Sequence, residues 1–99
     1  MNISVEEFKE IEDDVLVIDV RTKQEFDSLY KVPHAKNIEL KDLFNNYRTY
    51  LGIDFTRPIV TVCNAGNRSG EAALFLREQG YNARTLSGGS FAYKRKFEK

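Results

Sequence analysis

The sequence contains no tryptophan, one methionine, one cysteine, one histidine and two prolines in its 99 residues. A single cysteine cannot form an internal disulfide, and one cysteine with one histidine cannot supply the four ligands of a structural zinc site. We therefore expect neither a metal nor a cofactor. Cys63 is then either a buried apolar residue or a reactive thiol.

Long hydrophobic segments and an excess of charge of one sign are also absent. No apolar run approaches the roughly 20 residues that span a bilayer, and the N-terminus lacks the basic-then-apolar layout of a secretory signal. Fifteen basic residues are balanced by fifteen acidic ones, which argues against nucleic acid or a membrane as a partner. We expect a cytoplasmic protein that folds as a single domain over residues 1–99.

Segments typical of strands alternate with segments typical of helices. The apolar runs at 15–20 and 58–62 suit strands buried on both faces, and shorter strands are expected at 36–40 and 82–86. This alternation predicts an α/β fold, with a mainly parallel central sheet and helices on both faces.

The helices are indicated by capping residues and by apolar spacing. Two capping boxes, Ser4 with Glu7 and Thr22 with Glu25, predict short helices that begin just after Ser4 and Thr22. Gly80 is placed to end a helix. Further helices are expected at 40–51, 71–79 and 90–97.

Two polar or reactive residues fall at the ends of predicted strands. Asp19 ends the first long strand and Cys63 follows the second. Because ligands of parallel sheets bind outside the carboxyl ends of the strands, we expect both residues at one site.

The residues after Cys63 suit the stabilisation of an anion. A thiol at its reference pKa is only a few per cent ionised at neutral pH, so a reactive cysteine needs surroundings that lower its pKa. Free N–H groups at the start of the following helix, the flexible backbone of Gly66 and the positive charge of Arg68 would do so. Ser69 is expected to cap that helix, to bond the sulfur, or to do both with its one hydroxyl.

Four segments in this order resemble the rhodanese-like sulfurtransferases. They are VIDVRTKQEF, VPHAKNI, CNAGNRS and LSGGSFAY, which together extend over nearly the whole chain. The resemblance implies a parallel sheet flanked by helices and a persulfide on Cys63. It also implies that the backbone of an anion-binding loop surrounds the sulfur; we expect that loop to comprise Asn64, Ala65, Gly66, Asn67, Arg68 and Ser69.

The implied reaction moves a sulfane sulfur from a small-molecule donor such as thiosulfate to an acceptor. Cyanide, an external thiol or dithiol, or a sulfur-carrier protein could serve as acceptor, and neither step needs a histidine base. His34 is therefore expected to be a loop or surface residue. The chain departs from the family pattern at Tyr30, Lys31 and His34, and it has Tyr93 in place of a usual tryptophan.

Two other functions remain open. Cysteine-dependent phosphatases share this fold, but their signature is His-Cys followed by five residues and arginine, whereas Val62 precedes Cys63 here and four residues separate it from Arg68. A loop one residue shorter should close too tightly around phosphate. The second alternative is a catalytically idle module that binds proteins, although such modules usually lack the cysteine.

Asp19 and Arg21 are candidate supporting residues at the same site. Arg21 could contact an anionic donor, but an ion pair with Glu25 one turn along is the favoured interpretation. Asp19 is expected to bond the loop backbone.

Overall fold

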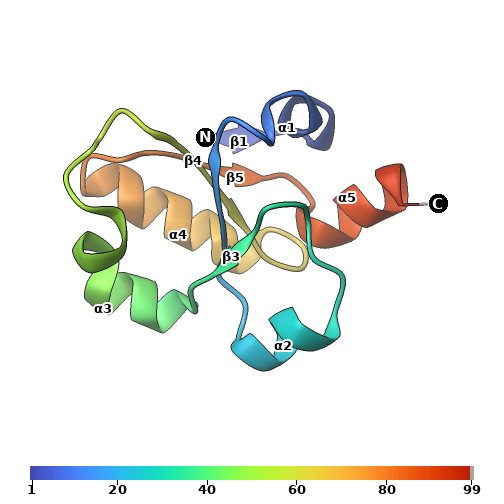
Figure 1. Ribbon diagram of the computed structural model, residues 1–99, viewed down its shortest axis with the longest axis horizontal. Coiled ribbons are helices and arrows are strands. Elements are labelled where there is room, and N and C mark those ends of the chain that lie inside the picture. The colour runs from blue at the N-terminus through green and yellow to red at the C-terminus, as the bar shows by residue number, and fades with distance from the viewer. Residues whose placement is uncertain (99) are drawn as a thin grey trace.

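Five strands form one parallel sheet in the computed structural model, which describes residues 1–98 (Figure 1). The strand order is β1-β5-β4-β2-β3, and every neighbouring pair is parallel. The predicted parallel sheet is thus confirmed. The strands are β1 (Asn2–Ile3), β2 (Leu16–Asp19), β3 (Lys36–Asn37), β4 (Pro58–Val62) and β5 (Asn82–Leu86).

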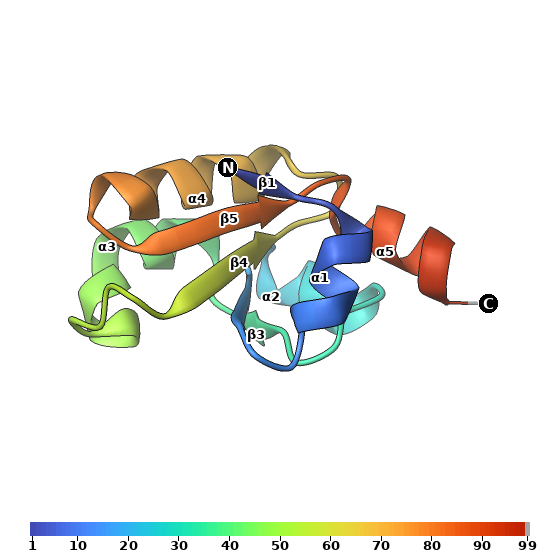
Figure 2. The same cartoon turned by 90° about the horizontal axis from the view of Figure 1, so that it is seen from above.

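Helices cover both faces of this sheet, as the sequence predicts. Figure 2 shows α4 and α1 on opposite sides of β4 and β5. The helices are α1 (Val5–Ile11), α2 (Lys23–Ser28), α3 (Leu40–Leu51), α4 (Asn67–Glu78) and α5 (Gly89–Phe97).

Each face of the sheet carries its own apolar core because neighbouring side chains of a strand point to opposite faces. Ile18 and Ile59 pack with Leu76 of α4. Val17 and Val60 pack on the other face, in the cluster that contains Phe8, Leu86 and Tyr93. Burial of such side chains stabilises the fold by about 1.5–3 kcal/mol each.

Local capping signals also place the helix ends. Both capping boxes are present, with the hydroxyls of Ser4 and Thr22 accepting from the backbone N–H groups of Glu7 and Glu25. Gly80 follows α4 with φ of 101°, and its N–H donates to the carbonyl of Arg77 at 3.0 Å. A left-handed glycine directly after a helix ends it with little strain.

The elements differ from the prediction by more than one residue at two boundaries, and one strand was not predicted. The strand expected at 36–40 is only Lys36–Asn37, because α3 already begins at Leu40. The helix expected at 71–79 begins four residues earlier, at Asn67. Strand β1 was not predicted, because two residues are too few to show a periodic pattern; it pairs with β5, opposite Thr85 and Leu86.

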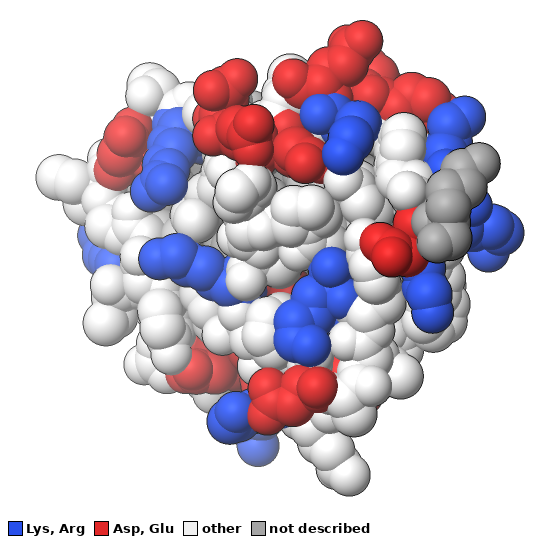
Figure 3. All heavy atoms as spheres, turned by 45° about the vertical axis from the view of Figure 1, so that its right-hand side comes forward, with Lys and Arg blue, Asp and Glu red and all other residues white. Residues whose placement is uncertain are grey.

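Charged side chains of both signs are interspersed over the face shown in Figure 3, and acidic ones gather along its upper edge. Residues 1–98 include no helix that has both the length and the apolar character needed to cross a membrane.

Candidate active site

Cys63 lies directly after β4, where the chain leaves the sheet and turns toward α4. Its neighbour Val62 is opposite Asp19 in the register of β4 with β2. The two strand ends that the sequence points to are therefore side by side. Cys63 is only 2% exposed.

The loop after Cys63 folds back so that its N–H groups point at the sulfur. The N–H groups of Gly66 and Ser69 donate to the Cys63 Sγ at 3.1 and 3.4 Å. Gly66 has φ of 112°, a left-handed conformation that a residue with a side chain rarely adopts. The tight turn therefore depends on this glycine.

The sulfur occupies the position of a helix cap. Gly66 is the N-cap of α4 and offers no capping side chain, while Ser69 is the third residue of the helix. An N-cap side chain normally accepts from the N–H of the second or third helical residue, and here the Cys63 Sγ accepts that bond. This explains why α4 begins at Asn67, and it excludes Ser69 as the cap.

Ser69 instead bonds the sulfur with its hydroxyl. Its Oγ lies 3.4 Å from the Cys63 Sγ and 2.7 Å from the Oγ1 of Thr85 on β5. When Thr85 donates to Ser69, the serine proton is directed at the sulfur. Thr85 was missed in the sequence, because only the pairing of β4 with β5 brings it to the site.

These contacts determine the acidity of the thiol. Burial raises the pKa of Cys63, but hydrogen bonds from the Ser69 hydroxyl and from the N–H groups of Ser69, Gly66 and Ala65 outweigh it. The pKa of the thiol is therefore held below its ordinary value. The site favours a thiolate, the nucleophilic form of cysteine.

Asp19 and Arg21 form a fully buried ion pair behind the loop. The guanidinium Nη2 lies 2.7 Å from Asp19 Oδ2, and both side chains have 0% exposure. Asp19 also accepts from the backbone N–H of Arg21 at 3.0 Å. Arg21 does not pair with Glu25, so that interpretation was wrong. Arg21 precedes Thr22, the N-cap of α2, so it is not one helical turn from Glu25, and the Glu25 carboxylate binds Arg68.

Arg21 connects this pair to the loop. Its Nη1 donates to Asn64 Oδ1 at 3.0 Å, and its Nη2 donates to the carbonyl of Tyr30 at 2.9 Å. Because Arg21 has no exposed surface, its charge acts by positioning Asn64 rather than by contacting a solute.

Glu25 of α2 is bound to Arg68 instead. Its Oε1 and Oε2 accept from Arg68 Nη1 and Nη2 at 2.7 and 3.0 Å, and its Oε2 also accepts from Asn64 Nδ2 at 3.2 Å. The hydrogen bonds from Arg68 and from Thr22 lower the pKa of Glu25 to about 2. Sequence spacing gave no sign of this pair, which joins residues 43 positions apart.

The outer side of the loop is fixed by the start of α5. The carbonyls of Cys63 and Asn64 accept from the N–H groups of Ser90 and Phe91 at 2.9 and 3.2 Å. A Cβ at Gly89 would lie 2.4 Å from the carbonyl oxygen of Cys63. The double glycine of the LSGGSFAY segment thus permits close contact between α5 and the loop.

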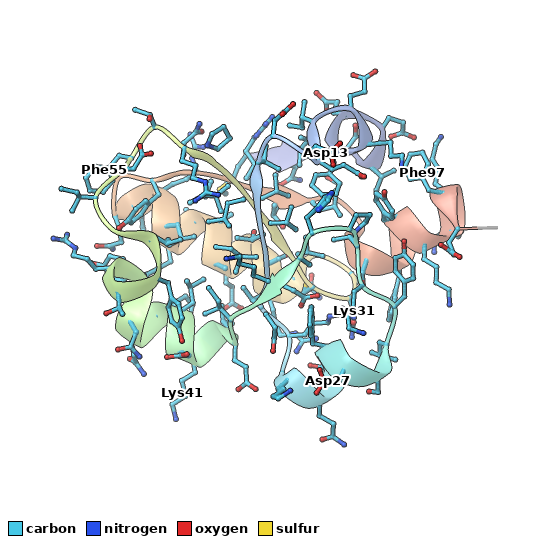
Figure 4. The ribbon with its side chains drawn as sticks, viewed as in Figure 1. Asp13, Asp27, Lys31, Lys41, Phe55 and Phe97 are labelled. Carbon is cyan, nitrogen blue, oxygen red and sulfur yellow. The ribbon has the colours of Figure 1, made fainter. Side chains whose placement is uncertain are left out.

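The remaining candidate residues contribute no side chain to the contacts described above. Ala65 and Asn67 are exposed on the loop and at the first position of α4. His34 is held by Asp13, with 2.7 Å between Nε2 and Oδ1, beside the end of α1 (Figure 4). With Glu12 these two form a cluster of metal-ligand type, in which the Glu12 carboxylate already accepts from the Tyr93 hydroxyl at 2.7 Å.

Comparison with known proteins places the chain among similar sequences and folds. The family model described as a rhodanese-like domain matches residues 4–96. A Bacillus subtilis protein provisionally named a sulfurtransferase, YtwF, is 28% identical over 85 residues, which cover 86% of this chain and 79% of the relative.

Solved structures share the fold. A rhodanese-related protein from Thermoplasma volcanium superposes with a TM-score of 0.87 at 22% identity, covering 99% of this chain and 94% of the other. A Rhodopseudomonas palustris protein described as a possible tyrosine phosphatase superposes with a TM-score of 0.80 at 17% identity, covering 95% and 79%. At these identities the likeness concerns the fold alone.

Proposed function

The chain belongs to the rhodanese-like domain family, and on that premise we propose that it is a sulfurtransferase that carries sulfur as a persulfide on Cys63. The observation that supports this most is the convergence of the Gly66 and Ser69 N–H groups on a single sulfur atom. The same donors can stabilise a negative charge on the outer sulfur of a persulfide, because they are oriented before the charge arrives.

The loading step needs only the thiolate and a sulfane donor. Cys63 Sγ attacks the outer sulfur of thiosulfate; a new S–S bond forms, the old S–S bond breaks, and its electron pair leaves with sulfite. The transfer requires neither a proton nor an external oxidant. The lowered pKa of Cys63 supplies the nucleophile.

The unloading step regenerates the thiolate. Cyanide, a thiolate or one thiol of a dithiol attacks the outer sulfur, and the electron pair of the broken S–S bond returns to Cys63. The chain has one cysteine, so it cannot resolve the persulfide as an internal disulfide. We therefore propose an external acceptor, either a small thiol or a sulfur-carrier protein.

A phosphatase function receives less support from the site. Its central requirement is an arginine free to bind phosphate, whereas both terminal nitrogens of Arg68 are hydrogen-bonded to Glu25. The spacing of four residues between Cys63 and Arg68, one fewer than in the phosphatase signature, also argues against a phosphatase.

The test is intact-mass measurement after incubation with thiosulfate and again after addition of cyanide. We expect the mass of one sulfur atom to be gained and then lost, with thiocyanate released, and no change in Cys63→Ser. Wild-type protein that stays unmodified by thiosulfate and by glutathione persulfide would refute the proposal and favour a protein-binding module.

A further inference from the structure

The anion-binding group of Arg68 already has an anion bound to it. The two terminal nitrogens of the guanidinium form parallel hydrogen bonds to the two oxygens of Glu25, at 2.7 and 3.0 Å. This is the geometry in which arginine binds a planar carboxylate most strongly. An anionic substrate that approaches Cys63 must therefore compete with Glu25 for Arg68.

Three residues hold the Glu25 carboxylate in this position. Besides Arg68, the Nδ2 of Asn64 donates to its Oε2 at 3.2 Å, and the N–H of Thr22 donates to its Oε1 at 3.0 Å. Asn64 is itself bound to the buried Arg21. The carboxylate is thus tied to both the anion-binding loop and the start of α2, and its position does not rest on one flexible pair.

Glu25 is ionised at every pH at which the reactivity of the thiol would be measured. Its pKa of about 2 keeps it ionised at every pH above mild acid. The Glu25 carboxylate raises the pKa of Arg68 most, and negative charge on Cys63 and Asp19 raises it further. Arg68 also directly precedes Ser69, whose N–H and hydroxyl contact the Cys63 sulfur, so neutralising Arg68 changes the charge beside the thiol.

We propose that Glu25 is a specificity-determining residue, which biases Cys63 against anionic reagents and sulfur donors by occupying Arg68. The intended donor class is then a sulfane sulfur whose carrier brings no strong negative charge to Arg68, rather than a small dianion such as thiosulfate. The choice of donor rests on the proposed function, whereas the charge bias at Cys63 does not.

The decisive experiment compares two alkylating reagents that differ chiefly in charge. Iodoacetate is an anion and iodoacetamide is neutral, so the ratio of their rate constants with Cys63 reports the electrostatic bias and cancels the fraction of thiolate. In Glu25→Gln, glutamine can still complete the capping box with Thr22, because this motif accepts glutamate or glutamine. The charge is removed, and the oxygen that accepts from Arg68 Nη2 and Asn64 Nδ2 is replaced by an NH2 donor.

We expect the iodoacetate-to-iodoacetamide ratio to rise about three- to tenfold in Glu25→Gln at low salt, and to rise less at high salt, where ions screen the charge. The chain offers a matched control in Glu7→Gln, which makes the same change at the same position of the α1 capping box. This variant should leave the ratio unchanged. Arg68→Gln should lower the ratio in the Glu25→Gln background.

The same variants are then loaded with thiosulfate, and the rate is divided by that of iodoacetamide. A rise in this second ratio extends the bias to sulfur donors. An unchanged or lower alkylation ratio in Glu25→Gln would overturn the proposal. A raised alkylation ratio without sulfur loading from either thiosulfate or glutathione persulfide would uphold the role of Glu25 and refute sulfur transfer, so the two hypotheses fail separately.

Discussion

Among the contacts of residues 1–98 that lower the thiol pKa, the hydroxyl of Ser69 is the only side-chain group. A hydrogen bond to a charged group contributes about 1.5–3 kcal/mol, and water can replace part of it. We expect Ser69→Ala to reduce the thiolate population at neutral pH about tenfold. The pH profile of iodoacetamide alkylation measures this, and Ser87→Ala, which changes a serine outside the loop, should leave the profile in place.

Thr85 acts on the sulfur only through Ser69. Thr85→Val keeps the side-chain shape but removes the hydroxyl that lies 2.7 Å from Ser69 Oγ. We expect about a threefold loss of thiolate in the wild-type background and no further loss in Ser69→Ala, because coupled residues are not additive. Equal losses in both backgrounds would show that Thr85 works by another route.

The ion pair of Asp19 with Arg21 should be costly to break. Asp19→Asn leaves a buried guanidinium without its counter-charge, and we expect a loss of about 3–5 kcal/mol in the free energy of unfolding, measured with urea. Asp27→Asn is the matched control, because its pair with Lys23 is 55% exposed on the Asp27 side. There we expect a loss below about 1 kcal/mol.

At the scale of elements, the contact of α5 with the loop depends on Gly89. Alanine at this position would meet the Cys63 carbonyl at 2.4 Å and would need φ of 65°. We expect Gly89→Ala to lower the free energy of unfolding by more than about 1 kcal/mol and to slow alkylation. Gly70→Ala adds a Cβ with nothing within 4 Å in the interior of α4, and should instead stabilise by up to about 1 kcal/mol.

Most elements could be predicted because their signals are local. Strands at 58–62 and 82–86, both capping boxes and the glycine after α4 depend on residues close together in the sequence. The start of α4 could not be predicted in this way, because its cap is a sulfur atom before the helix rather than a side chain at the N-cap. Likewise, the loop residues were identified by type, but their partners Glu25 and Thr85 come from other elements.

For the whole molecule, acid unfolding should report the Glu25 contacts. The folded pKa of Glu25, about 2, lies below its ordinary value of 4.5. The ionised carboxylate therefore contributes stability that is complete above pH 4.5 and is lost as the pH falls toward 2. We expect Glu25→Gln to show a shallower decline of stability within this window, measured by urea unfolding at several pH values.

The other carboxylates with lowered pKa values, among them Glu6, Asp42 and Asp54, remain in both proteins. These carboxylates contribute equally to the plots of unfolding free energy against pH for the wild type and for Glu25→Gln. The difference between the two plots therefore isolates the contribution of Glu25. Parallel curves from pH 5 to 2 would mean that the bidentate contact adds no net stability to the fold.

The N–H groups of Ser90 and Phe91, at the start of α5, donate to the carbonyls of Cys63 and Asn64. Through these bonds the position of α5 affects the ionisation of the thiol. Each of these carbonyls belongs to a peptide unit whose orientation is then fixed, so docking of α5 and ionisation of Cys63 are linked equilibria. Linkage is reciprocal: if docking favours the thiolate, forming the thiolate must tighten docking by the same free energy. Amide hydrogen exchange at Ser90 and Phe91 should therefore slow when Cys63 ionises, after correction for the intrinsic effect of pH. The helix α5, which begins 26 residues after Cys63 in the sequence, would then report the charge of the thiol.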